Sequence, residues 1–142
     1  MTRVDFYFNA GSKLQVACQL AAKALQQRLR VLIYAPDDEV ARNLDRMLWT
    51  YQAIGFVPHC MASDPLAPET PVLISRDAQP AGHDEVMMNL HVETPPAFSR
   101  FQRLVEIVGE EEADRQAARG RFRYYRDRGY DISVHDLAEG AA

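Results

Sequence analysis

The first fifty residues alternate between short apolar runs and longer amphipathic segments. Residues 4–8, VDFYF, and residues 31–34, VLIY, have the length and composition of strands, and the second run is uniformly apolar, as in a strand covered on both faces. The segment from Ser12 to about Arg28 repeats apolar residues at helical spacing, and Ser12 is a suitable N-cap. This order of strand, helix and strand predicts a βαβ unit, whose two strands lie parallel in one sheet.

The rest of the chain continues the pattern. A second helix is predicted from PDDE at residues 36–39, where acids favour a helix N-terminus, to about Tyr51. Further strands are expected at residues 56–58, 72–75 and 88–92. Residues 94–109 and 110–128 are predicted as a final pair of helices, the second ending before Gly129. The pattern predicts one three-layer α/β/α domain over residues 1–142 with a mostly parallel sheet of about five strands, and the last ten residues or so are expected as a flexible tail.

Overall charge and cysteine content exclude several classes of protein. The chain has a net charge of −4, whereas a general nucleic-acid binder usually carries an excess of Lys and Arg. No apolar run approaches the ~20 residues that cross a bilayer, and the N-terminus lacks a signal-peptide pattern, so a cytoplasmic location is expected. The two cysteines, Cys18 and Cys60, form neither a disulfide framework nor a metal-ligand spacing.

Features that resemble catalytic motifs are incomplete. The NAGSKL turn at residues 9–14 has Gly11 and Lys13 of a phosphate-binding loop, but Leu14 stands where the motif needs Ser or Thr. No GxGxxG motif is present, and the histidines at positions 59, 83, 91 and 135 have no metal-ligand spacing. A small nucleotide hydrolase or phosphatase, built on the Gly11–Lys13 turn or on Cys60 beside His59, stays open as an alternative. The sequence itself predicts no catalytic residue, cofactor or metal site.

The segment AARGRFRYYRDRGY, at residues 117–130, holds five arginines and four aromatic residues. On one helix, Arg119, Arg123 and Arg126 fall at i, i+4 and i+7 and therefore share a face, with Phe122 beside them. Arginine is the side chain best suited to bidentate capture of a carboxylate or phosphate. This face of the helix therefore predicts an anion-binding surface.

Other roles stay open for the same segment. Acids early and arginines late in a helix complement its dipole, at about 0.3–1 kcal/mol each. Phe122 and Tyr125 also suit a hydrophobic core, and direct binding of single-stranded DNA would use Phe122 or Tyr124 to stack on bases. Arg121 and Arg128 point elsewhere on the helix and are expected to be surface charge.

Several segments taken together resemble a known family. They are FYFN at residues 6–9, RVLIYAPDDEVARNLDRMLW at 30–49, FVPH at 56–59, NLHVETPPAFSRFQRLVEIV at 89–108 and ARGRFRYYRDRGYDI at 118–132. Over nearly its whole length the chain resembles the chi subunit of the bacterial DNA polymerase III holoenzyme. The resemblance implies a Rossmann-like α/β domain that lacks a working nucleotide site and is not itself an enzyme.

The resemblance also implies two partners and contact with DNA only through them. Chi subunits form a heterodimer with the psi subunit, which tethers them to the clamp loader, and they bind the acidic C-terminal tail of single-stranded DNA-binding protein. That tail ends in an aromatic residue with a free carboxylate. By position, the implied peptide site consists of Arg119, Phe122 and Arg123, with Arg126 as a further candidate, and Arg123 stands where the family is expected to have lysine.

The implied psi interface lies around the end of the second helix and the FVPH segment. It consists of Leu48, Trp49, Tyr51, Phe56 and Val57. Tryptophan is enriched at interface hot spots, but it is equally common in protein cores, so both roles stay open for these residues.

Overall fold

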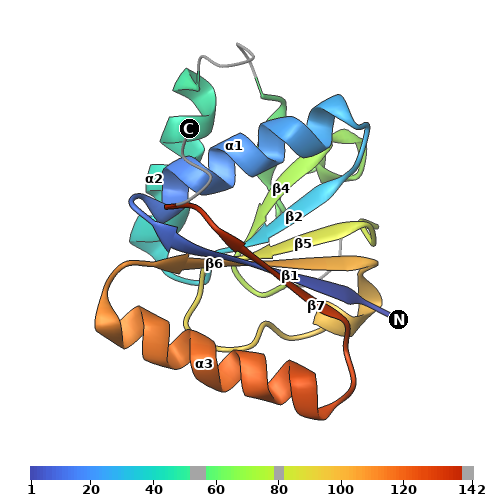
Figure 1. The fold of residues 1–142 in the computed structure, drawn as a ribbon. Helices are drawn as coiled ribbons and strands as arrows, with labels where there is room; N and C mark the ends of the chain where they lie inside the picture. The colour runs from blue at the N-terminus through green and yellow to red at the C-terminus, as the bar shows by residue number, and fades with distance from the viewer. Residues whose placement is uncertain (52–56, 79–81, 139–142) are drawn as a thin grey trace.

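The computed structural model describes residues 1–51, 57–78 and 82–138, which build one seven-stranded sheet flanked by helices (Figure 1). The strand order is β3-β4-β2-β5-β6-β1-β7, and every neighbouring pair is parallel. In chain order the elements are β1 (Arg3–Ala10), α1 (Lys13–Gln26), β2 (Val31–Tyr34), α2 (Asp38–Thr50), β3 (His59–Met61), the 3-10 turn η1 (Ala67–Glu69), β4 (Val72–Ser75), β5 (Val86–Asn89), the 3-10 turn η2 (Phe98–Arg100), β6 (Arg103–Gly109), α3 (Glu112–Asp127) and β7 (Ile132–Asp136).

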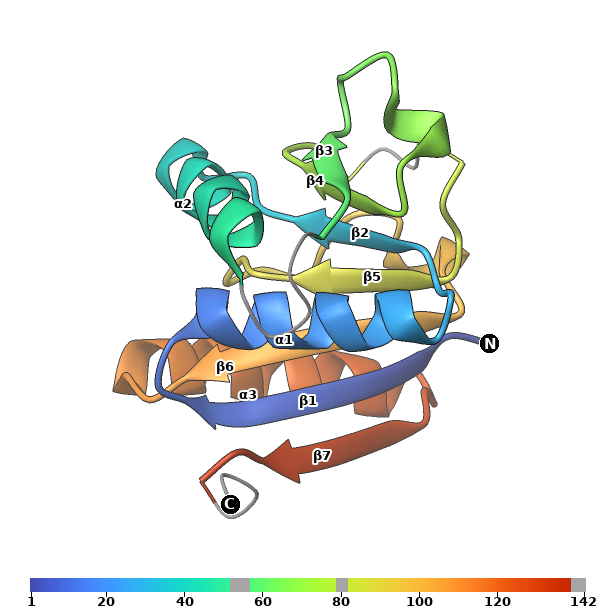
Figure 2. The same cartoon turned by 90° about the horizontal axis from the view of Figure 1, so that it is seen from above.

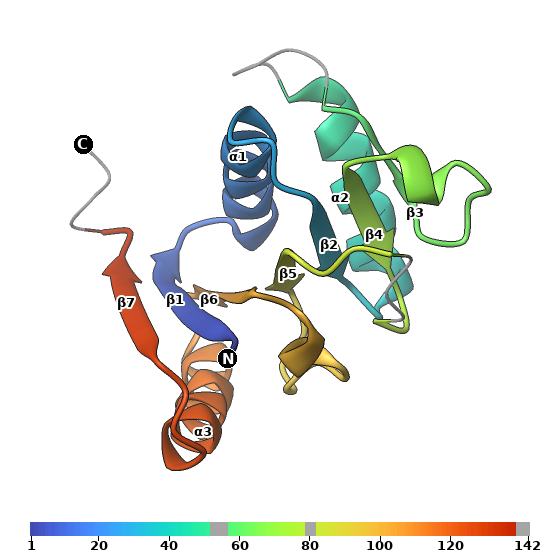
Figure 3. The same ribbon diagram turned by 90° about the vertical axis from the view of Figure 1, so that its right-hand side faces the viewer.

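Helices cover both faces of the sheet. Helices α1 and α2 pack against each other on one face, and α3 lies on the opposite face, as the end-on view of Figure 3 shows. Figure 2 shows β7 at one edge of the sheet, beside β1, and β3 and β4 at the other edge. These three layers confirm the predicted α/β/α fold, with seven strands instead of about five.

The apolar sequence explains the two layers of core. Strands β2, β4 and β5 are buried at every position, which accounts for their continuous apolar runs. One core cluster, which includes Leu44 and Leu48, fills the space between the sheet and α1–α2. The other, which includes Phe6, Leu104 and Tyr125, lies between the sheet and α3. Each helix is therefore fixed to the sheet by its own apolar stripe.

The predicted helix ends are confirmed. Ser12 caps α1, since its hydroxyl accepts a hydrogen bond from the backbone N–H of Gln15 at 3.2 Å. Asp37 caps α2 in the same way, and Asp38 and Glu39 occupy its first turn. Helix α3 ends just before Gly129, whose φ of +81° lies in the left-handed region that favours glycine.

The predicted helix over residues 94–109 is wrong. This segment contains the short turn η2 followed by strand β6, which lies between β5 and β1 in the sheet. Apolar residues at positions 104, 105 and 108 fit one face of a helix, but they also fit a strand whose two faces are both buried. The β-branched residues Val105, Ile107 and Val108 favour the strand, and their preference prevails here.

The other differences concern strand positions. Strand β3 begins at His59 instead of residue 56; Phe56 itself lies outside the described residues. Strand β5 begins and ends earlier than the predicted residues 88–92. Strand β7 was not predicted, because most of its side chains are exposed and the segment therefore lacks an apolar pattern. Because β7 takes in the first residues of the predicted tail, flexibility stays a prediction only for the residues beyond it.

Candidate peptide-binding groove

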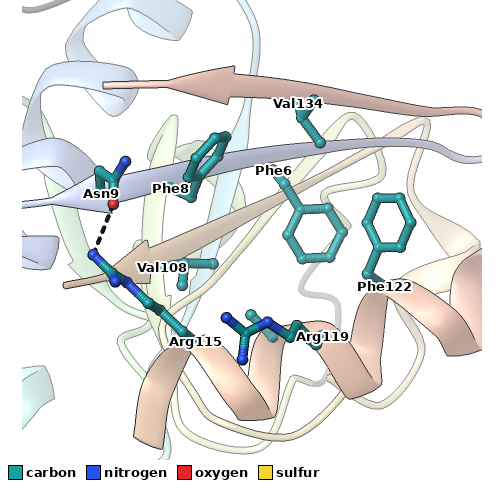
Figure 4. Close-up of a pocket in the computed structure, with 9 residues that line it drawn as sticks. Phe6, Phe8, Asn9, Val108, Arg115, Arg119, Phe122 and Val134 are labelled. Atoms are coloured by element: carbon teal, nitrogen blue, oxygen red, sulfur yellow. Dashed lines mark hydrogen bonds between the residues drawn. The ribbon is translucent and has the colours of Figure 1, made fainter. Parts of the chain in front are cut away.

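A hollow of about 430 Å³ lies between α3 and the edge of the sheet formed by β1 and β7 (Figure 4). We call it the α3 groove, and it is lined by Phe6, Phe8, Asn9, Val108, Arg115, Ala118, Arg119, Phe122 and Val134. Alternate residues of β1 face the groove because strand side chains alternate between the two faces of a sheet. On α3 the lining positions follow the spacing i, i+3, i+4 and i+7, which is one face of a helix.

Aromatic and aliphatic side chains form most of the groove lining. The rings of Phe6 and Phe122 lie 5.6 Å apart at an interplanar angle of 54°, which is a favourable tilted arrangement. Phe6 is nearly buried, whereas Val134 on β7 has 58% of its surface exposed. An apolar residue of this exposure at the mouth of an aromatic hollow leaves room for an apolar side chain from another molecule.

One end of the groove is cationic. Arg115 donates from Nη2 to Asn9 Oδ1 at 3.0 Å, which holds its guanidinium against β1 (Figure 4). Arg119 forms an ion pair with Glu112 at 3.2 Å, and both of these side chains are more than half exposed. The hydrogen bond from Arg119 lowers the pKa of the Glu112 carboxyl. The groove therefore combines an apolar lining with two guanidinium groups that solvent and ligands can reach.

The structure brings two of the four predicted peptide-site residues into this groove. Arg119 and Phe122 line it directly, and the core alternative for Phe122 is met in part because its ring packs on Phe6 while remaining partly exposed. Arg123 and Arg126 are exposed on the neighbouring stripe of α3, where Arg126 pairs with Asp127 at 3.2 Å. Their part in peptide binding stays a prediction.

Sequence reasoning did not predict the other seven of the nine residues that line the groove. Arg115 lies four residues before Arg119, so extending the helical spacing by one turn was enough to find it. The lining residues of β1 and β7 are a different case. Phe6, Phe8, Asn9 and Val134 come from strands far apart in the sequence, and only the sheet order brings them beside α3.

The expectation that Arg121 is surface charge is wrong. Its side chain is only 3% exposed, and Nε donates to Oε1 of Glu106, which is fully buried on β6, at 3.1 Å. Tyr125 donates its hydroxyl to Oε2 of the same carboxylate at 2.6 Å, and Asn89 donates to Oε1 at 2.9 Å. Residues 103–109 form a strand, so Glu106 points toward α3 and attracts the one arginine on the inner side of the helix.

The buried cluster around Glu106 shifts the protonation of its members. Burial raises the pKa of the Glu106 carboxyl, although the Arg121 charge and the hydrogen bonds from Tyr125 and Asn89 act in the opposite direction. Burial and the neighbouring Glu106 carboxyl raise the pKa of Tyr125. Tyr125 is fully buried, so the core alternative is confirmed for this residue. Arg128, in contrast, is exposed as expected and lies 3.6 Å above the ring of Tyr124.

The turn that resembles a phosphate-binding loop is occupied by the chain's own carboxylate. Lys13 Nζ lies 3.3 Å from Asp114 Oδ2, and the same oxygen accepts the backbone N–H of Gly109 at 2.6 Å. The hollow between the starts of α1 and α3 is also lined by Glu110 and Glu111, which repel phosphate. This geometry does not support a phosphate-binding site in the Gly11–Lys13 turn.

The cysteines also lack the surroundings of a nucleophile. His59 bonds to the Val57 carbonyl at 2.7 Å and to Asp45 at 3.0 Å, and no such bond joins it to the Cys60 thiol. Burial raises the pKa of the Cys18 thiol to about 11, which disfavours the reactive thiolate. Among the described residues, no three His, Cys, Asp or Glu side chains are grouped to hold a metal ion, and no described helix has the length and apolar character to span a membrane.

Comparisons with known proteins identify the family of the chain. The family model of the DNA polymerase III chi subunit, HolC, matches residues 1–133. The chain belongs to this family. It is 40% identical to DNA polymerase III subunit chi of Pseudomonas aeruginosa PAO1 over 141 residues, which cover 96% of this chain and 98% of that protein. It is 29% identical to DNA polymerase III subunit chi of Escherichia coli K12, over 84% of this chain and 82% of that protein.

Membership of the chi family establishes the general role. Chi is an accessory subunit of the polymerase and is not itself its catalytic subunit, so the chain is a DNA replication protein. Among solved structures, the C-terminal domain of Saccharomyces cerevisiae Dbp5, bound to Gle1 and IP6, matches with a TM-score of 0.62 and 10% identity over 95% of this chain and 90% of that domain. At that identity the likeness concerns the fold alone.

The chi-family residues predicted for the psi interface divide between core and surface. Leu48 and Val57 are completely buried and belong to the core cluster beneath α2. Trp49 is 57% exposed, and its ring lies 5.0 Å from the ring of His59 at an angle of 64°. Tyr51 is half-buried, and Phe56 lies outside the described residues. Of the four members of this set that the structure describes, Trp49 and Tyr51 are the two accessible to a partner.

Proposed function

We propose that this chi-family chain is a non-catalytic adaptor that binds the acidic C-terminal tail of single-stranded DNA-binding protein in the α3 groove. Through the psi subunit, bound near Trp49 and Tyr51, it links that protein to the clamp loader at the replication fork in the cytoplasm. The observation that carries the proposal is the α3 groove itself, an aromatic hollow with Arg115 and Arg119 at one end in a chain of net charge −4.

The chemistry of the groove suits such a tail. A terminal aromatic side chain would enter between Phe122, Phe6 and Val134, where burial of its ring stabilises the complex. The terminal carboxylate and the preceding acids would bond to Arg115 and Arg119 and then to the outer arginines 123 and 126. Simultaneous attachment to the loader and to a coat of many tails raises the effective concentration, so each tail can bind weakly.

Titration of a labelled tail peptide tests this proposal. Arg119→Ala removes a charge-assisted hydrogen bond of about 1.5–3 kcal/mol, which corresponds to about 10- to 100-fold weaker binding. Phe122→Ala is expected to weaken binding by a similar factor, and binding should fall as salt is added because the charges are screened. Arg42→Ala is a matched control, since Arg42 is an exposed arginine of α2, the helix on the opposite face of the sheet (Figure 3). Unchanged affinity in Arg119→Ala, Arg123→Ala and their double variant would rule out this site.

A further inference from the structure

A second hollow, which we call the α1 hollow, lies beneath the C-terminal half of α1, on the face of the sheet opposite the α3 groove. Its volume is about 400 Å³. Its lining includes Arg3, Val86 and Arg103, which stand at the starts of β1, β5 and β6, so it opens at the amino-terminal edge of the sheet. Strand β7 separates the two sites, because Ser133 and His135 face the α1 hollow while Val134 faces the α3 groove.

A buried carboxylate organises the floor of this hollow. The Asp5 side chain is 6% exposed and receives hydrogen bonds from Arg103 Nε at 2.7 Å and His135 Nε2 at 3.0 Å. Although burial acts to raise it, the pKa of Asp5 is held below its usual value by His135 and Arg103. The ionised Asp5 therefore fixes Arg103 and His135 in place and offsets one of the positive charges around them.

The remaining lining is rich in hydrogen-bond donors and positive charge. Arg3, Lys23 and Arg103 supply three cations, whereas Asp5 is the single acid among the described residues that line the hollow. Within the described part of the chain, the side chains of Lys23, Gln27 and Ser133 make no hydrogen bond or ion pair with another residue. Tyr7 accepts a hydrogen bond from Arg103 Nη2 at 3.1 Å, so its own hydroxyl proton can be donated to a ligand.

An aromatic pair lies beside these donors. The rings of Tyr7 and His135 stack at 4.4 Å with an interplanar angle of 14°. A positive surface next to stacked aromatic rings is the arrangement by which proteins hold a phosphate and an attached base. The usual ligand position of such a fold, at the carboxyl ends of the strands, is closed to phosphate by Asp114, Glu110 and Glu111. In the α1 hollow, by contrast, the one acid among the described lining residues is Asp5, which is already bonded to Arg103 and His135.

We propose that the α1 hollow binds a phosphate group, carried either by a free nucleotide or by the backbone of single-stranded nucleic acid. Lys23 on α1 and Arg3 on β1 contact the phosphate from opposite sides, and the Ser133 hydroxyl completes the contact from β7. This proposal does not depend on peptide binding in the α3 groove. It also differs from the hypothesis that the arginines of α3 bind DNA. Our proposal predicts that substitutions of Arg3 and Lys23 weaken binding, whereas the other hypothesis predicts that substitution of Arg123 does.

Backbone amide NMR titrations with three probes locate the site. Inorganic phosphate, thymidine monophosphate and a short oligothymidylate are added separately to the full chain. We expect salt-sensitive shifts at residues 3–7, 23–27 and 133–135. Shifts with the mononucleotide equal to those with the oligomer identify a nucleotide site, and shifts that need the oligomer identify a strand-binding site. No shift in these segments with any of the three probes overturns the proposal.

Matched variants separate this hollow from the α3 arginines. Arg3→Ala combined with Lys23→Ala changes two exposed residues and should leave the fold intact. If an oligomer binds, loss of two phosphate contacts lowers the slope of log affinity against log salt by about 1.4 and weakens binding by about tenfold at moderate salt. Arg123→Ala on α3 is the control and should have little effect. An equal or larger loss in Arg123→Ala contradicts the proposal and assigns the binding to α3.

Discussion

In the described part of the chain each face of the sheet holds one buried carboxylate, and the pKa values of the two carboxyls shift in opposite directions. Glu106 on β6 faces α3, and Asp5 on β1 faces α1; the two strands are neighbours, and Glu106 pairs in register with Phe6. Burial raises the pKa of Glu106, whereas hydrogen bonds from His135 and Arg103 lower the pKa of Asp5 against the effect of burial. The difference follows from the covering helices, since α3 seals Glu106 completely and α1 leaves the cations around Asp5 at the rim of an open hollow.

This contrast teaches that position decides what an arginine does. On the α3 face one arginine is inside and neutralises Glu106, so the exposed arginines are left for a ligand. On the α1 face Arg103 serves the carboxylate while remaining about a quarter exposed, at 27%. Charge alone, counted along the sequence, cannot distinguish these roles.

The largest expected effect comes from breaking the sealed pair. Arg121→Ala leaves Glu106 as an uncompensated buried charge, which is expected to cost about 3–5 kcal/mol of unfolding free energy. Urea unfolding measures this loss. Arg128→Ala, at the exposed C-cap of α3, should cost no more than about 1 kcal/mol, because it loses an exposed cation–π contact with Tyr124. Equal losses of stability in the two variants would show that the buried pair of Arg121 and Glu106 does not contribute more than an exposed arginine.

The same distinction between sealed and open applies to the apolar residues of α2, which also covers the α1 face. Leu48→Ala should cost about 2–5 kcal/mol of stability because it opens a cavity in the core. Trp49→Ala should cost far less stability but should abolish capture of the psi subunit, if the exposed ring is the hot spot of that interface. Capture by immobilised psi and unfolding of each variant are measured together, and normal psi capture by Trp49→Ala would contradict the proposed interface.

The helices and the exposed face of α3 could be predicted from the sequence. Helical spacing and caps predicted α1, α2 and α3 to within two residues at each end, and with them the shared face of Arg119 and Phe122. The burial of Arg121 could not be predicted, because its partner Glu106 lies in a segment whose sequence pattern predicts a helix. Apolar spacing over residues 101–108 does not distinguish a helix from a strand that is buried on both faces.

The residues that line the α3 groove and the α1 hollow could not be predicted together from the sequence, because the topology of the sheet brings them together. Parallel strands pair segments that are distant in sequence, so β7 meets β1 across more than a hundred residues. Val134, Ser133 and His135 acquire their roles only from that pairing. The sequence of β7, residues 132–136, has no regular apolar pattern, and most of its side chains are exposed, so the segment by itself predicts no strand.

Acid titration tests the opposite shifts of the two carboxylates. Since the folded-state pKa of Asp5 is lowered, its contribution to stability is present above the unfolded value and is lost as the pH falls through the folded value. The stability advantage of the wild-type chain over Asp5→Asn should therefore be complete above about pH 5 and shrink as the pH falls below about pH 4. For Glu106 the raised pKa reverses the sign, so the wild-type chain should gain relative to Glu106→Gln as the pH falls. Parallel trends in the two variants, followed by urea unfolding at each pH, would contradict the contrast.

The smallest expected effect concerns the open side of α3, where the chain's own acid competes for a groove arginine. Glu112 pairs with Arg119 at 3.2 Å while both side chains remain more than half exposed, so the pair is weak and solvent-screened. Glu112 holds Nη1 of Arg119 and therefore competes with a bound acidic peptide for this guanidinium. Glu112→Gln should therefore tighten peptide binding by about twofold in low salt, with little gain in high salt where the competing charge is already screened. Asp127→Asn is the matched control, because it releases Arg126, which lies outside the groove lining. Tighter binding in Asp127→Asn but not in Glu112→Gln would move the principal anion contact from Arg119 to Arg126.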